Sequence, residues 1–344
     1  MSAGILAAQP FPALSRERRV PLPDLTDGAI APRVLYLENS RFPAVTRQEL
    51  RRVLRAAARL VQAHFGVSMR LPERIAVHPI DAAFHDLVEN APFRMKRMIG
   101  DFRNGRVDWQ RVEDSLIAQI AKQQDPLEEQ IAFARPYLLH PLEREDRASF
   151  ARAVVETFRA RLSHWTRARL PDGHPVIGRV PGRPDLPLNE YLYWSLMAKR
   201  GVEAEIVLTN QLVASVEYVS LPVHSSIRGG ISGGATEYNP ASAFGSSVWV
   251  SLFPYLSDDP QIRALRGGAR YSREQAFDYA GAMLAHEMGH QLLHLGHPWS
   301  NPACPMRPAE ALDFAAWVGK FDAEKCPVGS SPAMRPGAIA IPVW

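Results

Sequence analysis

Residues 286–297 read His-Glu-Met-Gly-His-Gln-Leu-Leu-His-Leu-Gly-His, the densest group of metal-binding side chains in the chain. Histidines four residues apart lie one turn from each other on a helix, so His286 and His290 can meet a single ion. Glu287 follows the first histidine and can reach a water molecule on that ion. This H-E-x-x-H spacing suits a zinc site with a glutamate as its base.

The residues around the motif predict one long, largely buried helix. Ser272 and, three residues later, Gln275 form a capping box at its start. No proline follows until Pro298, and Gly296 is expected to end the helix just before His297. Apolar residues recur at helical spacing over this stretch, namely Ala276, Tyr279, Ala280, Met283, Leu284, Met288, Leu292 and Leu295.

A catalytic zinc site needs a third protein ligand and leaves one position for water. His297 lies where the chain can turn back toward the ion, and we favour it as the third ligand. Glu310, further downstream, is the alternative. His294 lies about 12 Å along the axis from His286 at ~1.5 Å per residue, so we expect it beside the ligands, as support or packing. His224, at the head of a glycine-rich stretch, is a further candidate for the cleft.

With the turn Cys304-Pro305-Met306-Arg307-Pro308, the motif resembles the metzincin metallopeptidases, and within that clan the archaemetzincin-like proteins. The specific match covers about residues 272–308. The resemblance implies Zn²⁺ bound by His286, His290 and His297, with Glu287 as the catalytic residue and Met306 beneath the zinc.

The sequence departs from the metzincin pattern H-E-x-x-H-x-x-G-x-x-H at two positions. Leu293 stands at the glycine and Gly296 at the third histidine, so that His297 comes one residue late. No tyrosine follows Met306, and the four-cysteine second zinc site of archaemetzincins is absent from the sequence. The shift leaves both His297 and Glu310 open as the third ligand.

The resemblance implies a peptidase in which a zinc-activated water attacks a peptide or protein substrate, with Glu287 as general base. In metzincins the substrate lies along an edge strand, which here implies residues 248–253 or the loop just before them. A gluzincin-type peptidase using Glu310 is one alternative. Another is a zinc-binding protein with little or no turnover, its cleft covered by a helical insertion.

Composition narrows the classes of partner. The chain has 344 residues and a net charge of +4, and its arginines are spread over predicted helices, so we expect no nucleic-acid partner. No apolar run approaches the ~20 residues of a membrane span. The N-terminus lacks a basic signal-peptide region, which favours a cytoplasmic location. Cys304 and Cys326 could pair, but their spacing does not decide it, and the oligomeric state stays open.

We expect an α+β fold with a metzincin-like mixed sheet, an active-site helix and a large helical insertion. The predicted parts are an extended arm at residues 1–30, the start of the catalytic domain at 31–80, the helical insertion and linker at 81–188, and the zinc-binding part at 189–344.

Local patterns predict the individual elements. Near the N-terminus, a strand at 33–38, a helix capped by Thr46 and Glu49 and ended by Gly66, and a strand at 67–71 imply a parallel pair joined by a crossover. Insertion helices are expected to start at Asp108 and Asp125, with a third at 142–170. Further on we expect a helix from Asn189 to Gly201, strands at 205–208 and 248–253, and loops at 224–247.

Overall fold

The structure is a computed structural model that describes residues 17–25, 28–90, 109–122, 126–176, 179–180, 183–187, 191–214, 222–337 and 339–342. The helix starts predicted at Asp108 and Asp125 and the cap at Asn189 lie outside the described residues, as does most of the predicted N-terminal arm.

The core of the fold is a mixed sheet with the strand order β5-β3-β8-β10-β9. These strands are β3 (Val34–Glu38), β5 (Ala76–Pro79), β8 (Ile206–Thr209), β9 (Gly234–Tyr238) and β10 (Ser246–Ser251). Neighbouring strands run parallel except β9, which is antiparallel to β10. A mixed sheet among several helices agrees with the predicted α+β class.

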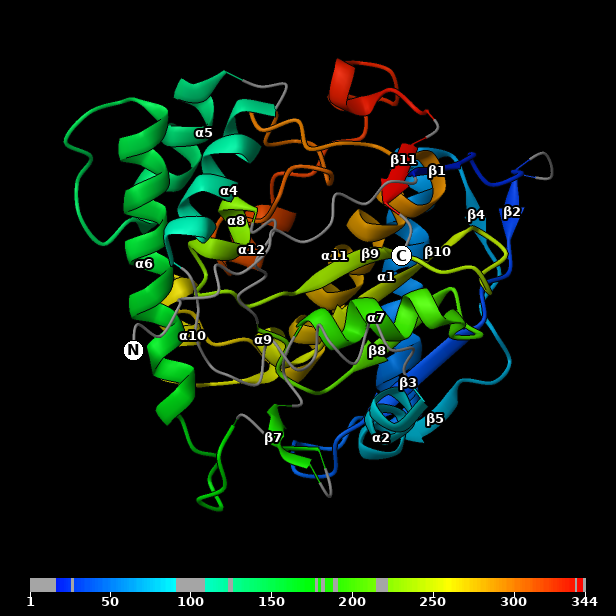
Figure 1. Ribbon diagram of the computed structural model, residues 1–344. Helices are drawn as coiled ribbons and strands as arrows, with labels where there is room; N and C mark the ends of the chain where they lie inside the picture. Colours follow the sequence, from blue (N-terminus) through cyan, green and yellow to red (C-terminus); the bar gives the residue numbers. More distant parts are fainter. Residues whose placement is uncertain are drawn as a thin grey trace, which may run out of the picture.

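Helices cover both faces of this sheet (Figure 1). On one face α1 (Arg47–Phe65) packs along α11 (Arg273–Leu293), and on the other lie α2 (Ile80–Asn90) and α7 (Tyr191–Gly201). Because side chains alternate along a strand, Leu208 and Val250 face α1 and α11, whereas Val207 and Trp249 face α2 and α7. The predicted zinc helix α11 is thus buried directly against the sheet.

The first crossover differs from the prediction in its second strand. Helix α1 has the predicted capping box of Thr46 and Glu49 and ends at Gly66. The strand after it, β4 (Ser68–Met69), pairs with β2 (Ala29–Ile30) outside the main sheet, and the parallel partner of β3 is β5. An extended pattern predicts a strand but not its partner, and β5, exposed at the sheet edge, lacks the apolar alternation that would have marked it.

The helices α4 (Trp109–Lys122), α5 (Leu127–Ala134) and α6 (Arg147–Arg167) form a hydrophobic cluster of their own. That cluster also contains Trp299 and two apolar residues at the glycine-rich stretch, so it packs beside the metal-binding part. All of helix α2 but its first residue falls within the range 81–188 predicted as an insertion, yet the helix packs on the sheet through Phe84 and Leu87. The predicted linker holds a hairpin of β6 (Arg179–Val180) and β7 (Arg183–Pro187).

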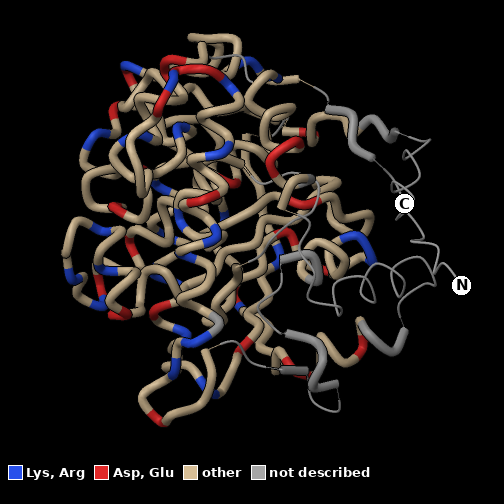
Figure 2. Tube along the Cα trace, turned by 60° about the vertical axis from the view of Figure 1, so that its left-hand side comes forward, with Lys and Arg blue, Asp and Glu red and all other residues tan. Residues whose placement is uncertain are grey.

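Short elements complete the described chain: β1 (Glu17–Val20), η1 (Arg135–Tyr137), α8 (Val223–Ser226), α9 (Phe253–Leu256), α10 (Pro260–Leu265), α12 (Phe314–Val318), η2 (Pro332–Met334) and β11 (Ile339–Pro342). Strands β1 and β11 pair antiparallel, which joins the two ends of the described chain. Basic and acidic residues are interspersed along the trace (Figure 2). None of the described helices is long and apolar enough to cross a membrane.

Candidate metal centre

Helix α11 begins as predicted and ends earlier than predicted. The Ser272–Gln275 capping box is present at its start. Gly296 was predicted to end the helix, but its last residue is Leu293. The helix ends there because His294 adopts a left-handed conformation with φ 54°. The Nδ1 atom of His294 lies 2.6 Å from the Gly337 carbonyl oxygen, which fixes this turn.

This turn brings His297 back to the helix. The Nε2 atom of His290 lies 3.2 Å from Nε2 of His286 and 3.0 Å from Nε2 of His297. One nitrogen from each ring lies within 4.8 Å of the others, a grouping that could hold a metal ion. Glu310 is not part of this group, because its carboxylate pairs with Arg307 and Lys320.

Hydrogen bonds on the far side of the two helix histidines fix their tautomers. The Nδ1 atom of His286 lies 2.7 Å from the Pro305 carbonyl oxygen, and that of His290 lies 2.5 Å from the Leu295 carbonyl oxygen. A carbonyl oxygen only accepts, so each Nδ1 carries the proton and each Nε2 presents a lone pair. Burial lowers the pKa of His286 well below its usual range and that of His290 to about 4, which keeps both rings neutral.

The Nε2 lone pairs of His286 and His290 face each other at 3.2 Å and repel, and a cation bound between them would remove this repulsion. Zinc–nitrogen bonds of about 2.0–2.1 Å at tetrahedral angles place ligand nitrogens about 3.3–3.4 Å apart. The observed separations of 3.0 and 3.2 Å are close to that spacing. The donor set of three neutral imidazoles therefore fits a zinc ion with one position left for another ligand.

The predicted methionine turn lies against the same part of the helix. Met306 is fully buried, and a Cβ atom added to Gly289 would lie only 2.2 Å from its sulfur and 2.9 Å from Phe65 Cζ. A glycine is required at this position because the turn approaches the helix backbone closely. Pro305 in the same turn supports His286, so the turn and the ligands form one packed unit.

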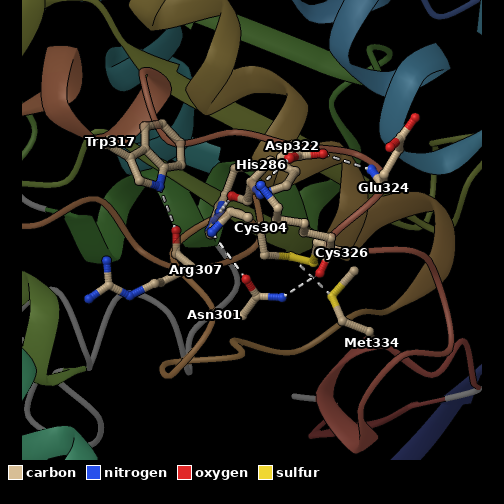
Figure 3. The surroundings of a disulfide bond; sticks show 12 residues. His286, Asn301, Cys304, Arg307, Trp317, Asp322, Glu324, Cys326 and Met334 are labelled. Atoms are coloured by element: carbon tan, nitrogen blue, oxygen red, sulfur yellow. Dashed lines mark hydrogen bonds and ion pairs between the residues drawn. A yellow bond between two sulfur atoms is a disulfide. The ribbon is translucent and has the colours of Figure 1, made fainter.

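A disulfide bond between Cys304 and Cys326 pins this turn to a segment 22 residues further on (Figure 3). The Cys304 sulfur also lies 3.5 Å from the Met334 sulfur. The pairing that the sequence left open is thus present.

Glu287 lies beside the histidines and is buried against β9. Its side chain is 6% exposed, and the Thr236 hydroxyl donates to its Oε2 atom and to its backbone carbonyl, at 2.9 Å each. Burial raises the pKa of Glu287 to about 8, and the Thr236 hydrogen bond opposes the rise. A Cβ atom at Gly234 would lie 2.9 Å from Glu287 Cγ, so the strand passes directly over the carboxylate.

Three further polar residues near the histidines lie outside the H-E-x-x-H motif. The ring of His224 packs edge-to-face on His297, with ring centroids 5.3 Å apart, and its Nδ1 atom is buried without a partner. Arg228 and Tyr255 are buried nearby, and each has a polar atom without a partner. His224 stood out in the sequence only by its place before the glycines, whereas Arg228 and Tyr255 gave no local signal.

No model of a known protein family matches the chain, and searches of curated proteins and of solved structures find no similar protein. The metzincin resemblance therefore rests on the motif residues alone. The protein has a mixed sheet and an α+β fold, and its helix α11 contributes to a three-histidine cluster beside a buried glutamate.

Proposed function

We propose that the chain is a zinc metallopeptidase of the metzincin type, in which His286, His290 and His297 hold the metal. The observation that supports this most is the pair of Nε2 lone pairs facing each other on neighbouring helix turns. Glu287 follows His286 directly in the motif. Its carboxylate is buried and accepts a hydrogen bond from the Thr236 hydroxyl.

A zinc ion bound there supplies Lewis acidity toward a water molecule and toward the substrate carbonyl. The positive charge of a metal ion held by the histidines would lower the pKa of Glu287 from about 8. The carboxylate can then accept the proton of the attacking water and later deliver it to the leaving amine. Thr236 orients the carboxylate by donating to Oε2, which leaves Oε1 for that proton. The buried surroundings strengthen these electrostatic interactions, because little water competes with them.

We place the substrate along β9. Residues 248–253, one of the two predicted choices, lie largely in β10, which is paired on both sides. The stretch just before them contains β9, which among the described strands is the edge strand on that side of the sheet. In an antiparallel pair alternate residues direct their backbone groups away from the partner. The Gly233–Ser251 hydrogen bond fixes this alternation, so the backbone of Gly234 and Thr236 faces away from β10. An extended peptide added there would pass beside Glu287.

The substitution Glu287→Gln tests the proposed role of the base. It keeps the size of the side chain and removes its basicity, so zinc content should stay at the wild-type level while peptide cleavage falls by about 10²–10⁴-fold. Zinc per chain and cleavage of a diverse peptide library are the two measurements. Full cleavage by the variant would remove Glu287 from the mechanism.

One observation favours a second candidate, a zinc-binding protein without useful turnover. The helical cluster of α4, α5 and α6 packs on Trp299, which contacts the ring of His297, so helices crowd one side of the centre. Wild-type protein incubated with the peptide library, with and without a chelator, separates the candidates. Chelator-sensitive cleavage supports the enzyme, and bound zinc without any cleavage supports the binding protein.

A further inference from the structure

Arg228 is a buried cation that has no acidic partner among the described residues. Its side chain is 3% exposed, its Nη2 atom donates to the Ala309 carbonyl oxygen, and its Nε atom has no partner. No carboxylate of the described chain lies within ion-pair distance of it. A buried charge without a counter-charge is costly, and such groups are normally paired or bound to a ligand.

Arg228 lies between two segments that contribute to the surroundings of the three histidines. It follows His224 by four residues, about one helical turn, and the His224 ring rests on His297. Its guanidinium reaches Ala309, three residues after Met306. Arg228 therefore connects the segment that leads into β9 with the segment that follows the methionine turn.

The charge of Arg228 acts on the groups around the three histidines. Burial is the main reason that the pKa of His297 is low and that of Glu287 is high. The positive charge of Arg228 adds to the first shift and opposes the second. Burial lowers the pKa of Arg228 itself only to about 10, so it remains charged at neutral pH.

Arg266 offers a comparison within the same chain. It is 2% exposed, donates to one carbonyl oxygen, that of Pro254, and has an Nε atom without a partner. Its guanidinium, however, lies over the ring of Tyr271 at 4.3 Å, a contact that stabilises a buried cation. No such ring contact is found for Arg228 within the described residues, so its charge has no equivalent compensation.

We propose that Arg228 binds a carboxylate of the substrate close to the scissile bond, which would make acidic peptides the preferred substrates. This inference rests on the proposed function. A carboxylate accepts well from a guanidinium, and the vacant Nε donor is available for it. The Tyr255 hydroxyl, buried without a partner and facing Gly233, is a second donor in the same region. The carboxylate can belong to an acidic side chain or to the peptide C-terminus.

The first arm of the test uses cleavage by zinc-loaded protein. Peptides are compared that carry Glu or Gln at each position around the cleaved bond, with the C-terminus free or amidated. We expect at least about a tenfold preference for one carboxylate source, its loss in Arg228→Met, and its retention in the matched control Arg266→Met. Dependence on the internal Glu identifies the side chain, and dependence on the free C-terminus identifies the terminal carboxylate.

The second arm measures binding and requires no turnover. Succinic acid monohydroxamate and its primary amide both offer a zinc-chelating group, and only the first has a carboxylate. By titration calorimetry, zinc-loaded wild type and Arg266→Met should bind the acid at least about tenfold more tightly than the amide, and Arg228→Met should bind both alike.

The two proposals fail in different ways. Equal binding of the acid and the amide by the wild type, or a ratio unchanged in Arg228→Met, overturns the role of Arg228. Equal affinity of the wild type for the acid and the amide is decisive by itself, so this outcome does not depend on whether a variant folds. A retained ratio with no cleavage of any peptide overturns the peptidase proposal and leaves the carboxylate site standing.

Discussion

The candidate metal centre is assembled from two halves that are held in different ways. The helix half, residues 286–290, carries two imidazoles and Glu287 on consecutive turns of α11. The loop half, residues 294–308, carries His297 and Met306 without any helix or strand. Helical geometry brings the two imidazoles of the helix half together, because residues four apart share a face.

The loop half is positioned by contacts with the C-terminal segment, residues 326–337. The Gly296 N–H donates to the Ala333 carbonyl oxygen at 2.6 Å, His294 bonds to Gly337, and Cys304 is joined to Cys326. A metal site can thus be half encoded in one short motif and half in a segment about 30 residues away. Substitutions in the two halves should separate these sources of order.

Replacing a ligand should have the largest effect, and it should be the same in both halves. His286→Ala and His297→Ala should each lower zinc affinity by more than the roughly 100-fold expected on losing a hydrogen-bond partner of a ligand. Glu310→Ala should keep the wild-type zinc content, because ion pairs already hold that carboxylate. Zinc per chain and competitive chelator titration provide the measurement. Loss of zinc in Glu310→Ala with retention in His297→Ala would instead establish a glutamate ligand.

Removing the disulfide should act through the loop half. In Cys304→Ser/Cys326→Ser the free energy of unfolding should fall by about 3 kcal/mol, the value expected for a loop of this length. Zinc affinity should fall by about 10–100-fold, since the Pro305 carbonyl that supports His286 would be less firmly placed. Denaturant unfolding with and without zinc gives both numbers. An unchanged zinc affinity would show that the turn holds its place without the bond.

Gly289→Ala should push the two halves apart. The added methyl group would collide with the Met306 sulfur and Phe65, and overpacking of this kind costs about 1–3 kcal/mol. Gly296→Ala is the matched control, because its Cβ would meet Ala333 at 3.4 Å, an ordinary contact. Thermal unfolding of zinc-free protein compares the two. Equal stability of both variants would contradict the close approach.

The smallest effect is expected at His294, where the helix half meets the loop half. His294→Val should be about 1–2 kcal/mol less stable than His294→Asn, because a branched side chain disfavours the left-handed conformation that asparagine tolerates. Both substitutions remove the hydrogen bond between the imidazole and Gly337, so the difference in their unfolding free energies reports the cost of the left-handed backbone. Unfolding in denaturant measures it, and equal stabilities would mean that the turn relaxes at no cost.

Sequence alone predicted the features that depend on neighbouring residues. The capping boxes at Thr46 and Ser272, the stop at Gly66 and the pairing of His286 with His290 all follow from residues within a few positions. Their geometry is set by local hydrogen bonds and helical periodicity, which the sequence displays directly.

Features set by distant contacts were missed or misplaced. A left-handed histidine is uncommon, so Gly296 was the expected helix end although His294 takes that role. Strand β9 lies in a glycine-rich stretch that suggested a loop, and its pairing with β10 is visible only in the fold. Arg228 contacts Ala309, just after the methionine turn, across 81 residues of chain, a separation that no local pattern records.

The Thr236 hydroxyl contacts both the carboxylate and the backbone carbonyl of Glu287, so it links the proposed peptide-binding strand β9 to the proposed general base. Any adjustment of β9 as it accommodates a peptide would be transmitted to the orientation of that carboxylate. Longer peptides pair with more of β9. They should therefore increase the rate of the chemical step more than they increase binding affinity.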